Sequence, residues 1–209
     1  MAEIVIVLGE SGSGKSTSLR NFEKDKVKIL NVSGKKLPFK NELSMLNLRN
    51  YSYQDAYTMI MKAVKKYEDE CKTFVIDDVQ YLMSFEYFDS TVSGYEKYNQ
   101  LGKHFKELLD FLQRDIKDDV IVYMLTHIEK KDNEKYAMKT VGKLLDEKLT
   151  IEGLVTICIR CIDENGHHFF KVHGDGTDTV KTPIGMFEED TLDNDLAIVD
   201  KAIRDYYGY

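Results

Sequence analysis

Cysteine is scarce in this chain, which holds only Cys71, Cys158 and Cys161 among its 209 residues. Three cysteines cannot supply a disulfide framework, so their number favours a reducing cytoplasm over an oxidising compartment. Long apolar runs are absent as well: nowhere do about 18 consecutive apolar residues occur, so we expect no membrane-spanning helix. The early apolar run at residues 4–8 lacks the basic region and the cleavage site of a signal peptide. We therefore expect a cytoplasmic protein without a membrane segment.

Basic residues are fewer than acidic ones. Lysine and arginine number 29 against 36 aspartates and glutamates, which gives a net charge of −7. The chain as a whole is therefore not a basic nucleic-acid-binding protein. Basic side chains do gather between residues 20 and 40, so a local basic face stays open as an alternative to an ordinary solvated surface. Because no linker, repeat or low-complexity segment interrupts the chain, residues 1–209 are expected to form a single domain.

The strongest pattern that is present is GESGSGKST at residues 9–17, which has the G-x-x-x-x-G-K-S spacing of a phosphate-binding loop. A continuous apolar run precedes it, as expected for a buried strand, and residues 16–23 contain no Gly or Pro and are predicted to continue as a helix. Glycines let the backbone approach phosphates closely, and successive N–H groups form an anion-binding nest at a helix N-terminus. Lys15 is expected to reach the β- and γ-phosphates of ATP, and the Ser16 hydroxyl to coordinate Mg²⁺. The predicted nucleotide-binding residues are Gly9, Glu10, Ser11, Gly12, Ser13, Gly14, Lys15, Ser16 and Thr17.

Two adjacent carboxylates follow a second run typical of a buried strand. The apolar residues 74–76 end in Asp77 and Asp78, an arrangement that phosphate-loop ATPases use to hold their metal ion. We expect Asp77 to hold Mg²⁺ together with Ser16, and Asp78 to act catalytically by orienting or activating the attacking water. Related ATPases often carry Glu at the second position, and the shorter Asp makes the role of Asp78 the weaker assignment. The alternative is a strand followed by a solvated Asp-Asp turn.

A further apolar strand, predicted for residues 120–125, ends at Thr126 and His127. If this strand lies beside the strand that precedes the phosphate loop, a polar side chain at its end can contact the γ-phosphate and report its loss. Thr126 and His127 are therefore candidate catalytic sensors, although such a pair also occurs in ordinary turns. Farther along, Lys139 and Lys143 are candidates for contacting DNA phosphates or a neighbouring subunit's nucleotide, with a plain surface loop as the alternative.

The remaining segments predict an α/β fold, a mostly parallel sheet flanked by helices with a C-terminal β-hairpin and helix. We expect a strand at residues 27–32, an irregular connection at 35–50, and helices at 53–70 and 101–117. The pair Asn165-Gly166 predicts the turn of the hairpin. A helix is expected between residues 194 and 209, with an apolar face of Ile198, Ala202, Ile203 and Tyr206.

Two further patterns have more than one interpretation. Residues 80–100 are rich in aromatic side chains, which could stack on unpaired bases but more often pack against a core or another subunit. The spacing Cys158-x-x-Cys161, with histidines nearby, suggests zinc. However, residues i and i+3 of a strand face opposite sides, so the two thiols should diverge.

On these motifs the chain resembles the small phage-encoded nucleotide-binding proteins of the AAA ATPase class, some of which are RecA-like single-strand annealing ATPases. The resemblance is carried by GESGSGKST, FVIDD, LTH and the tail pattern KTPIGMF…NDL…YY. It implies a RecA- or AAA-like fold and a Mg-ATP hydrolase stimulated by DNA. It also implies a role in phage homologous recombination on single-stranded DNA, as a homo-oligomer working with a single-strand-binding protein in the host cytoplasm.

Other functions remain open. Kinases that act on small molecules usually hold the phosphoryl group with several arginines in a lid, whereas the five arginines here are scattered singly. A GTPase is less expected still, because no N-K-x-D sequence is present to read a guanine base. The main alternative is an ATPase whose nucleotide state switches a protein partner, such as a helicase loader or an anti-host factor. Asp at position 78 and the lack of an obvious arginine finger favour that alternative.

Overall fold

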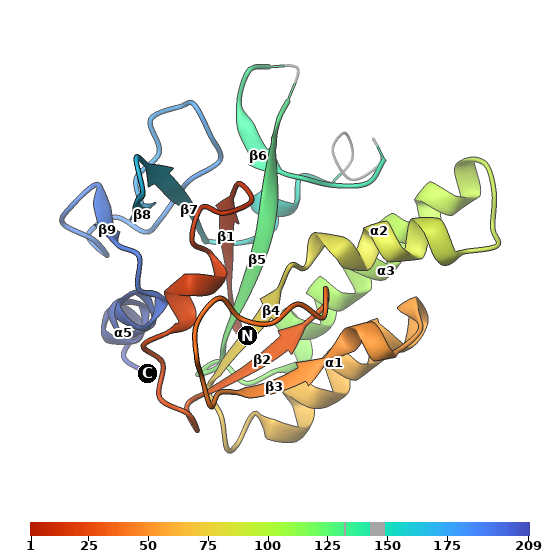
Figure 1. Cartoon of the computed structure of the whole chain (residues 1–209), viewed down its shortest axis with the longest axis horizontal. Coiled ribbons are helices and arrows are strands. Elements are labelled where there is room, and N and C mark those ends of the chain that lie inside the picture. The colour runs from red at the N-terminus through yellow and green to blue at the C-terminus, as the bar shows by residue number, and fades with distance from the viewer. Residues whose placement is uncertain (132, 143–148) are drawn as a thin grey trace.

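The computed structural model describes residues 1–131, 133–142 and 149–209, and within these ranges nine strands form one sheet (Figure 1). The strands are β1 (Glu3–Gly9), β2 (Val27–Asn31), β3 (Ser44–Asn47), β4 (Thr73–Asp77), β5 (Ile121–Lys130), β6 (Tyr136–Met138), β7 (Ile157–Glu164), β8 (His167–Lys171) and β9 (Thr191–Asp193). Their order is β3-β2-β4-β5-β1-β7-β8-β9, with β6 paired to β5 outside this path. All pairs from β3 to β7 are parallel, whereas β8, β9 and β6 pair antiparallel with their neighbours. The mostly parallel α/β sheet predicted from the sequence is confirmed.

Helices cover both faces of this sheet. On one face pack α1 (Tyr53–Tyr67), α2 (Gln80–Asp89) and α3 (Tyr95–Asp115). On the other lie the short 3₁₀ helix η1 (Ser16–Leu19) and α5 (Leu196–Tyr207), which contact each other (Figure 1). Two further short 3₁₀ helices are η2 (Leu48–Asn50) and η3 (Ile151–Leu154). In the part of the chain that the structure describes, no helix combines the length and the apolar character needed to cross a bilayer.

The strand β1 lies in the middle of the sheet and contributes to both cores. Ile4, Ile6 and Leu8 pack beneath α1, α2 and α3, whereas Val5 and Val7 pack beneath α5. A central strand buried on both faces needs apolar side chains at every position, which explains the unbroken apolar run before the phosphate loop. The strand therefore holds the start of the loop rigidly at the carboxyl edge of the sheet.

Local signals in the sequence set several boundaries of the helices and strands. The Ser52 side chain caps α1 by accepting a hydrogen bond from the Asp55 N–H at 3.2 Å. Asn165 and Gly166 form the two-residue turn between β7 and β8 with φ of 56° and 83°. Both values are positive, as a hairpin turn with an Asn-Gly pair requires.

The two cysteines of the C-x-x-C spacing diverge, as strand geometry predicts. Cys158 belongs to the core beneath α1, α2 and α3, whereas Cys161 belongs to the core on the opposite face of the sheet. Their thiols therefore cannot share one metal ion.

The helix predicted for residues 16–23 is wrong in length, because η1 ends at Leu19 and has 3₁₀ geometry. The Ser18 hydroxyl donates a hydrogen bond to the Lys15 carbonyl at 2.6 Å, and the Arg20 guanidinium donates one to the Thr17 carbonyl at 3.2 Å. These side chains engage carbonyls that a longer α-helix would use for its own backbone bonds. The loop is therefore followed by one tight turn instead of a long helix.

Four other expectations about the helices and connections need correction. The connection at residues 35–50 is not wholly irregular, since it contains β3 at the edge of the sheet. The helix predicted for residues 53–70 ends at Tyr67, and the helix predicted for 101–117 begins earlier, at Tyr95. The predicted inward face of α5 is displaced: Ile198 and Tyr206 are 47% and 45% exposed. Ile203 is buried as predicted, and with buried Leu196 and Val199 it follows the 3, 4 spacing of one helix face.

Candidate nucleotide site

The phosphate loop folds around the side chain of Lys15, which is only 6% exposed. The ammonium of Lys15 donates hydrogen bonds to the carbonyl oxygens of Gly9 and Glu10, at 2.9 and 2.8 Å. Burial lowers the pKa of Lys15 below its usual value. Gly12 and Gly14 have φ of 83° and 99°, a region that side chains with a Cβ rarely adopt. The spacing of glycines in the sequence is therefore a requirement of the loop's backbone.

Ser16 and Asp77 meet at the carboxyl edge of the sheet, although 61 positions separate them in the chain. The Ser16 hydroxyl lies 3.0 Å from Oδ1 and 3.2 Å from Oδ2 of Asp77. Ser16 is the first residue of η1, and Asp77 is the last residue of β4. Burial, and then repulsion from the neighbouring Asp78, raise the pKa of Asp77 to about 6. The structure thus brings together the hydroxyl and the carboxylate that the sequence predicts as metal ligands.

Asp78 directly follows β4 and points to a different set of partners. Its carboxylate lies 3.5 Å from Nε2 of His127 and 3.3 Å from Nζ of Lys35. Burial tends to raise the pKa of Asp78, but the hydrogen bond from His127 and the charge of Lys35 outweigh it and hold the pKa well below its ordinary range. Its backbone has φ of 63°, a left-handed conformation that Asp tolerates better than most residues.

The strand β5 lies between β1 and β4, as the sensor interpretation of Thr126 and His127 requires. The predicted end of this strand is wrong, however, because β5 continues to Lys130 and both residues lie within it. His127 pairs in register with Gly9, the first residue of the phosphate loop, and its ring packs against Tyr81 with centroids 6.0 Å apart. The side chain of Thr126, the preceding residue of β5, faces the opposite side of the sheet from that of His127. Thr126 is fully buried, and its hydroxyl donates a long hydrogen bond, 3.4 Å, to the His127 carbonyl. Of the two candidates, His127 is the one next to the carboxylates.

Residues 2–183 match the family described as AAA domain, and this span includes the phosphate loop, both carboxylates and His127. The chain belongs to the AAA domain family. No curated protein matches the chain. AAA domain proteins bind and hydrolyse ATP through a phosphate loop, generally as the Mg²⁺ complex. The segment beyond residue 183, which contains β9 and α5, lies outside the match.

The side chains of this AAA domain fit Mg-ATP. Ser16 and Asp77 offer hard oxygen donors, and Mg²⁺ is commonly held by one or two protein oxygens together with phosphate oxygens and water. Lys15 offers a cation at the loop that would enclose the phosphates. Glu10, Ser11 and Gly12 form the exposed rim of the loop, whereas Ser13 is buried beneath it.

Two cationic residues near the site carry no recognisable local pattern in the sequence. Lys35, which pairs with Asp78, belongs to the basic segment between residues 20 and 40 and lies close because β2 and β4 are adjacent. Arg160 of β7 lines a cavity of about 260 Å³ beside residues 10–13. Its guanidinium lies over the ring of Tyr136 and pairs with the buried Asp178 at 3.3 Å. Only the strand order brings these side chains to the loop of the AAA domain.

The residues considered for DNA contact differ in how far they are exposed. Tyr81, Phe85, Tyr87 and Tyr98 pack against the core, in agreement with the packing interpretation, whereas Phe88 and Tyr95 are 80% and 70% exposed. Lys139 is exposed, and its backbone N–H donates to the His127 carbonyl at 2.8 Å. Lys143 lies outside the described residues.

Proposed function

We propose that this AAA domain is a Mg-ATP hydrolase in which Lys15 binds the β- and γ-phosphates and Ser16 and Asp77 hold Mg²⁺. The observation that carries this proposal is the contact between the Ser16 hydroxyl and the Asp77 carboxylate beside the loop that encloses Lys15. Bound Mg²⁺ would neutralise the charge that develops on the phosphate oxygens. The single sheet supports the prediction that residues 1–209 act as one domain.

Asp78, His127 and Thr126 are proposed to act on the attacking water and on the state of the γ-phosphate. Because its pKa is low, Asp78 stays ionised and accepts a hydrogen bond well, but it removes a proton poorly. Its role is therefore to orient the water. His127 contacts Asp78 through its ring and pairs through its backbone with Gly9 at the start of the phosphate loop. Its ring could therefore change its contact with Asp78 when the γ-phosphate is lost. Thr126 contributes by fixing the backbone of His127.

The hydrolase proposal is tested with purified protein, ATP and Mg²⁺. We expect phosphate release that requires Mg²⁺ and stops when the metal ion is chelated. Asp77→Ala should lose Mg²⁺-dependent hydrolysis while it keeps some nucleotide binding, since Lys15 remains in place. Full activity in that variant would remove Asp77 from the metal site.

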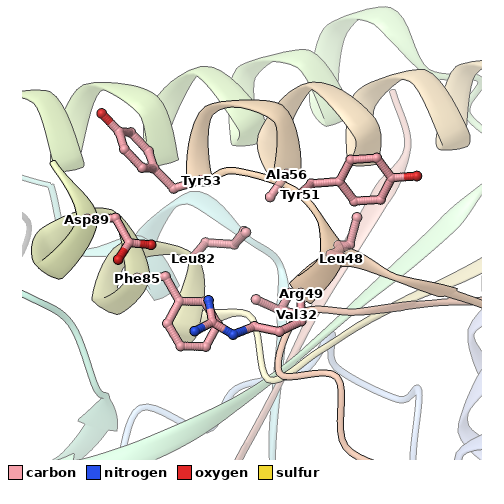
Figure 2. A pocket seen from close by; sticks show the side chains of 9 residues that line it. All are labelled: Val32, Leu48, Arg49, Tyr51, Tyr53, Ala56, Leu82, Phe85 and Asp89. Carbon is pink, nitrogen blue, oxygen red and sulfur yellow. The ribbon is translucent and has the colours of Figure 1, made fainter.

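We further propose that the ATPase acts on single-stranded DNA, as the resemblance of its motifs to phage recombination ATPases implies. One aromatic and basic cluster supports this (Figure 2). Around a small pocket beyond the end of β2, the Arg49 guanidinium lies over the Phe85 ring, 4.0 Å from its centroid, and Tyr51 and Tyr53 line the same pocket. Aromatic rings and arginine planes are the groups on which unpaired bases stack. A homo-oligomer and a single-strand-binding protein belong to the same proposal.

Steady-state ATP hydrolysis with and without single-stranded DNA tests this role. We expect DNA to stimulate hydrolysis, and we expect the stimulation to weaken between about 50 and 200 mM salt because phosphate contacts release counterions. Arg49→Ala should reduce the stimulation without changing the basal rate. A rate that ignores DNA at low salt would contradict the proposal.

The second candidate is an ATPase whose nucleotide state switches a protein partner. The ion pair between Lys35 and Asp78 favours it, because an aspartate held in this way is a poor base and hydrolysis would be slow. Tight ATP binding with negligible turnover, with or without DNA, would favour this candidate over the recombination ATPase.

A further inference from the structure

The carbonyl oxygen of Ser13, on the outer side of the phosphate loop, accepts hydrogen bonds from two side chains that are distant in the sequence. The Cys161 thiol donates to it at 2.9 Å, and Nδ1 of His168 lies 3.0 Å away. Cys161 belongs to β7 and His168 to β8, so the hairpin of the sheet supplies both contacts. A carbonyl oxygen has two lone pairs, and both are therefore engaged.

A second layer of contacts fixes the thiol. The Asn194 amide donates to Cys161 Sγ at 3.1 Å. The guanidinium of Arg20, just after η1, in turn donates to the side-chain and backbone oxygens of Asn194. Burial raises the pKa of Cys161 to about 11, so the group is a protonated thiol that can donate at neutral pH. The bonds run in one direction, from Arg20 through Asn194 and Cys161 to Ser13.

The geometry of the peptide group links this arrangement to the phosphates. In a planar trans peptide, the C=O of one residue and the N–H of the next point in opposite directions. A Ser13 carbonyl held outward by Cys161 and His168 therefore turns the N–H of Gly14 inward, toward the nest that receives phosphate oxygens. Gly14 also makes room for the brace, because a Cβ there would lie 3.1–3.2 Å from atoms of His168 and Asn194.

We propose that Cys161, His168 and Asn194 are positioning residues that brace the phosphate loop from behind and aim the Gly14 N–H at the bound nucleotide. This inference rests on the proposed function, since it assumes that the loop binds phosphates. It also gives a role to the NDL part of the tail pattern, whose Asn194 lies outside the AAA domain match. The ligand affected is any nucleoside di- or triphosphate, because the nest contacts phosphates that ADP and ATP share.

Isothermal titration calorimetry with Mg-ADP and Mg-ATP tests the brace. Each of Cys161→Ala and His168→Ala removes one hydrogen bond to Ser13, so each should weaken both affinities by about three- to tenfold. Cys161→Ser keeps a hydroxyl donor and should restore affinity to within about twofold of the native protein. The KM for ATP should rise accordingly while kcat changes less, because the Gly14 N–H contacts the phosphates equally in the bound substrate and in the transition state.

Two matched controls separate positioning from a general loss of stability. His167→Ala changes the exposed neighbour of His168 on β8, and Cys158→Ala changes the buried cysteine on the opposite face of β7. Both should leave nucleotide affinity unchanged, even if Cys158→Ala lowers Tm. Cys161→Ala and His168→Ala with native affinities would overturn the brace. A native protein that binds neither nucleotide would instead overturn the proposed function.

Discussion

Asp77 and Asp78 are neighbours in the chain, but the pKa of Asp77 is raised in the folded protein and that of Asp78 is lowered. Replacing each by its amide should therefore change stability in opposite directions. Burial raises the pKa of Asp77 from 3.8 to about 6, so above pH 6 its charge costs the folded state about 3 kcal/mol. Asp77→Asn removes this charge and keeps an oxygen near Ser16. The weaker hydrogen bond to a neutral amide offsets about 1 kcal/mol of the gain. The remaining 2 kcal/mol or so corresponds to a rise in Tm of roughly 4–8 °C for a domain of this size.

The sign of this effect depends on pH and on the metal ion. The folded state of the native protein binds an extra proton at Asp77 between pH 3.8 and about 6, so its stability falls as pH rises through that window. The Tm gain of Asp77→Asn should therefore be full at pH 8 and should vanish below pH 3.8. Mg-ATP should raise the Tm of the native protein more than that of the variant, and hydrolysis by the variant should fall by about 100-fold or more.

Thermal unfolding in chelator at pH 8 is the assay, and Asp78→Asn is the matched control. That variant loses the charge interaction with Lys35 and weakens the hydrogen bond with His127, so its Tm should fall. Asn tolerates the left-handed backbone of this position, so strain adds nothing. A lower Tm for Asp77→Asn under these conditions, or a higher one for Asp78→Asn, would refute the reasoning.

Three further outcomes follow from the site and the core. Lys15→Ala should abolish nucleotide-dependent behaviour, and unchanged ATP affinity in calorimetry would contradict the site. His127→Ala should lower kcat by about tenfold or more at nearly constant ATP affinity; a loss of affinity alone would place His127 in binding. Burial raises the pKa of Glu3 from 4.5 to about 7, so the folded state loses stability as pH rises through that window. Glu3→Gln should therefore raise the free energy of unfolding above pH 7 by about 1 kcal/mol, a value already reduced for the partial solvation of this side chain. This corresponds to a rise in Tm of roughly 2–4 °C, with no gain below pH 4.5. Equal Tm values for the variant and the native protein at pH 8 would contradict this.

Features that depend on a few adjacent residues could be predicted from the sequence. The phosphate loop needs glycines at fixed positions, the hairpin turn needs Asn165-Gly166, and the buried strands need continuous apolar runs. Each is a local requirement, so a short window of sequence reveals it. The meeting of Ser16 with Asp77 was also predicted, because Asp77 ends β4 and Ser16 follows the loop that leaves β1 at the same edge of the sheet.

Features that depend on which strands become neighbours could not be predicted. Lys35 reaches Asp78, and Cys161 reaches Ser13, only because of the strand order. The face of α5 was misplaced for a related reason. Asp200 is buried there, since it accepts hydrogen bonds from Thr73 at 3.1 Å and from Arg204 at 2.8 Å. A charged residue whose partner Thr73 lies 127 positions away looks like a surface residue in the sequence.

The central place of β1 also bears on the order in which the protein can fold. Its neighbours in the sheet, β5 and β7, begin at residues 121 and 157, more than 100 positions later in the chain. Non-local strand pairing of this kind is slow, because the entropy of closing a long loop is lost before the favourable contacts between the strands form. During synthesis the segment carrying the phosphate loop emerges early, yet β1 has no strand to pair with until β5 has left the ribosome. The nascent chain should therefore acquire nucleotide affinity late and in one step, and its exposed apolar first strand makes it a natural client for chaperones.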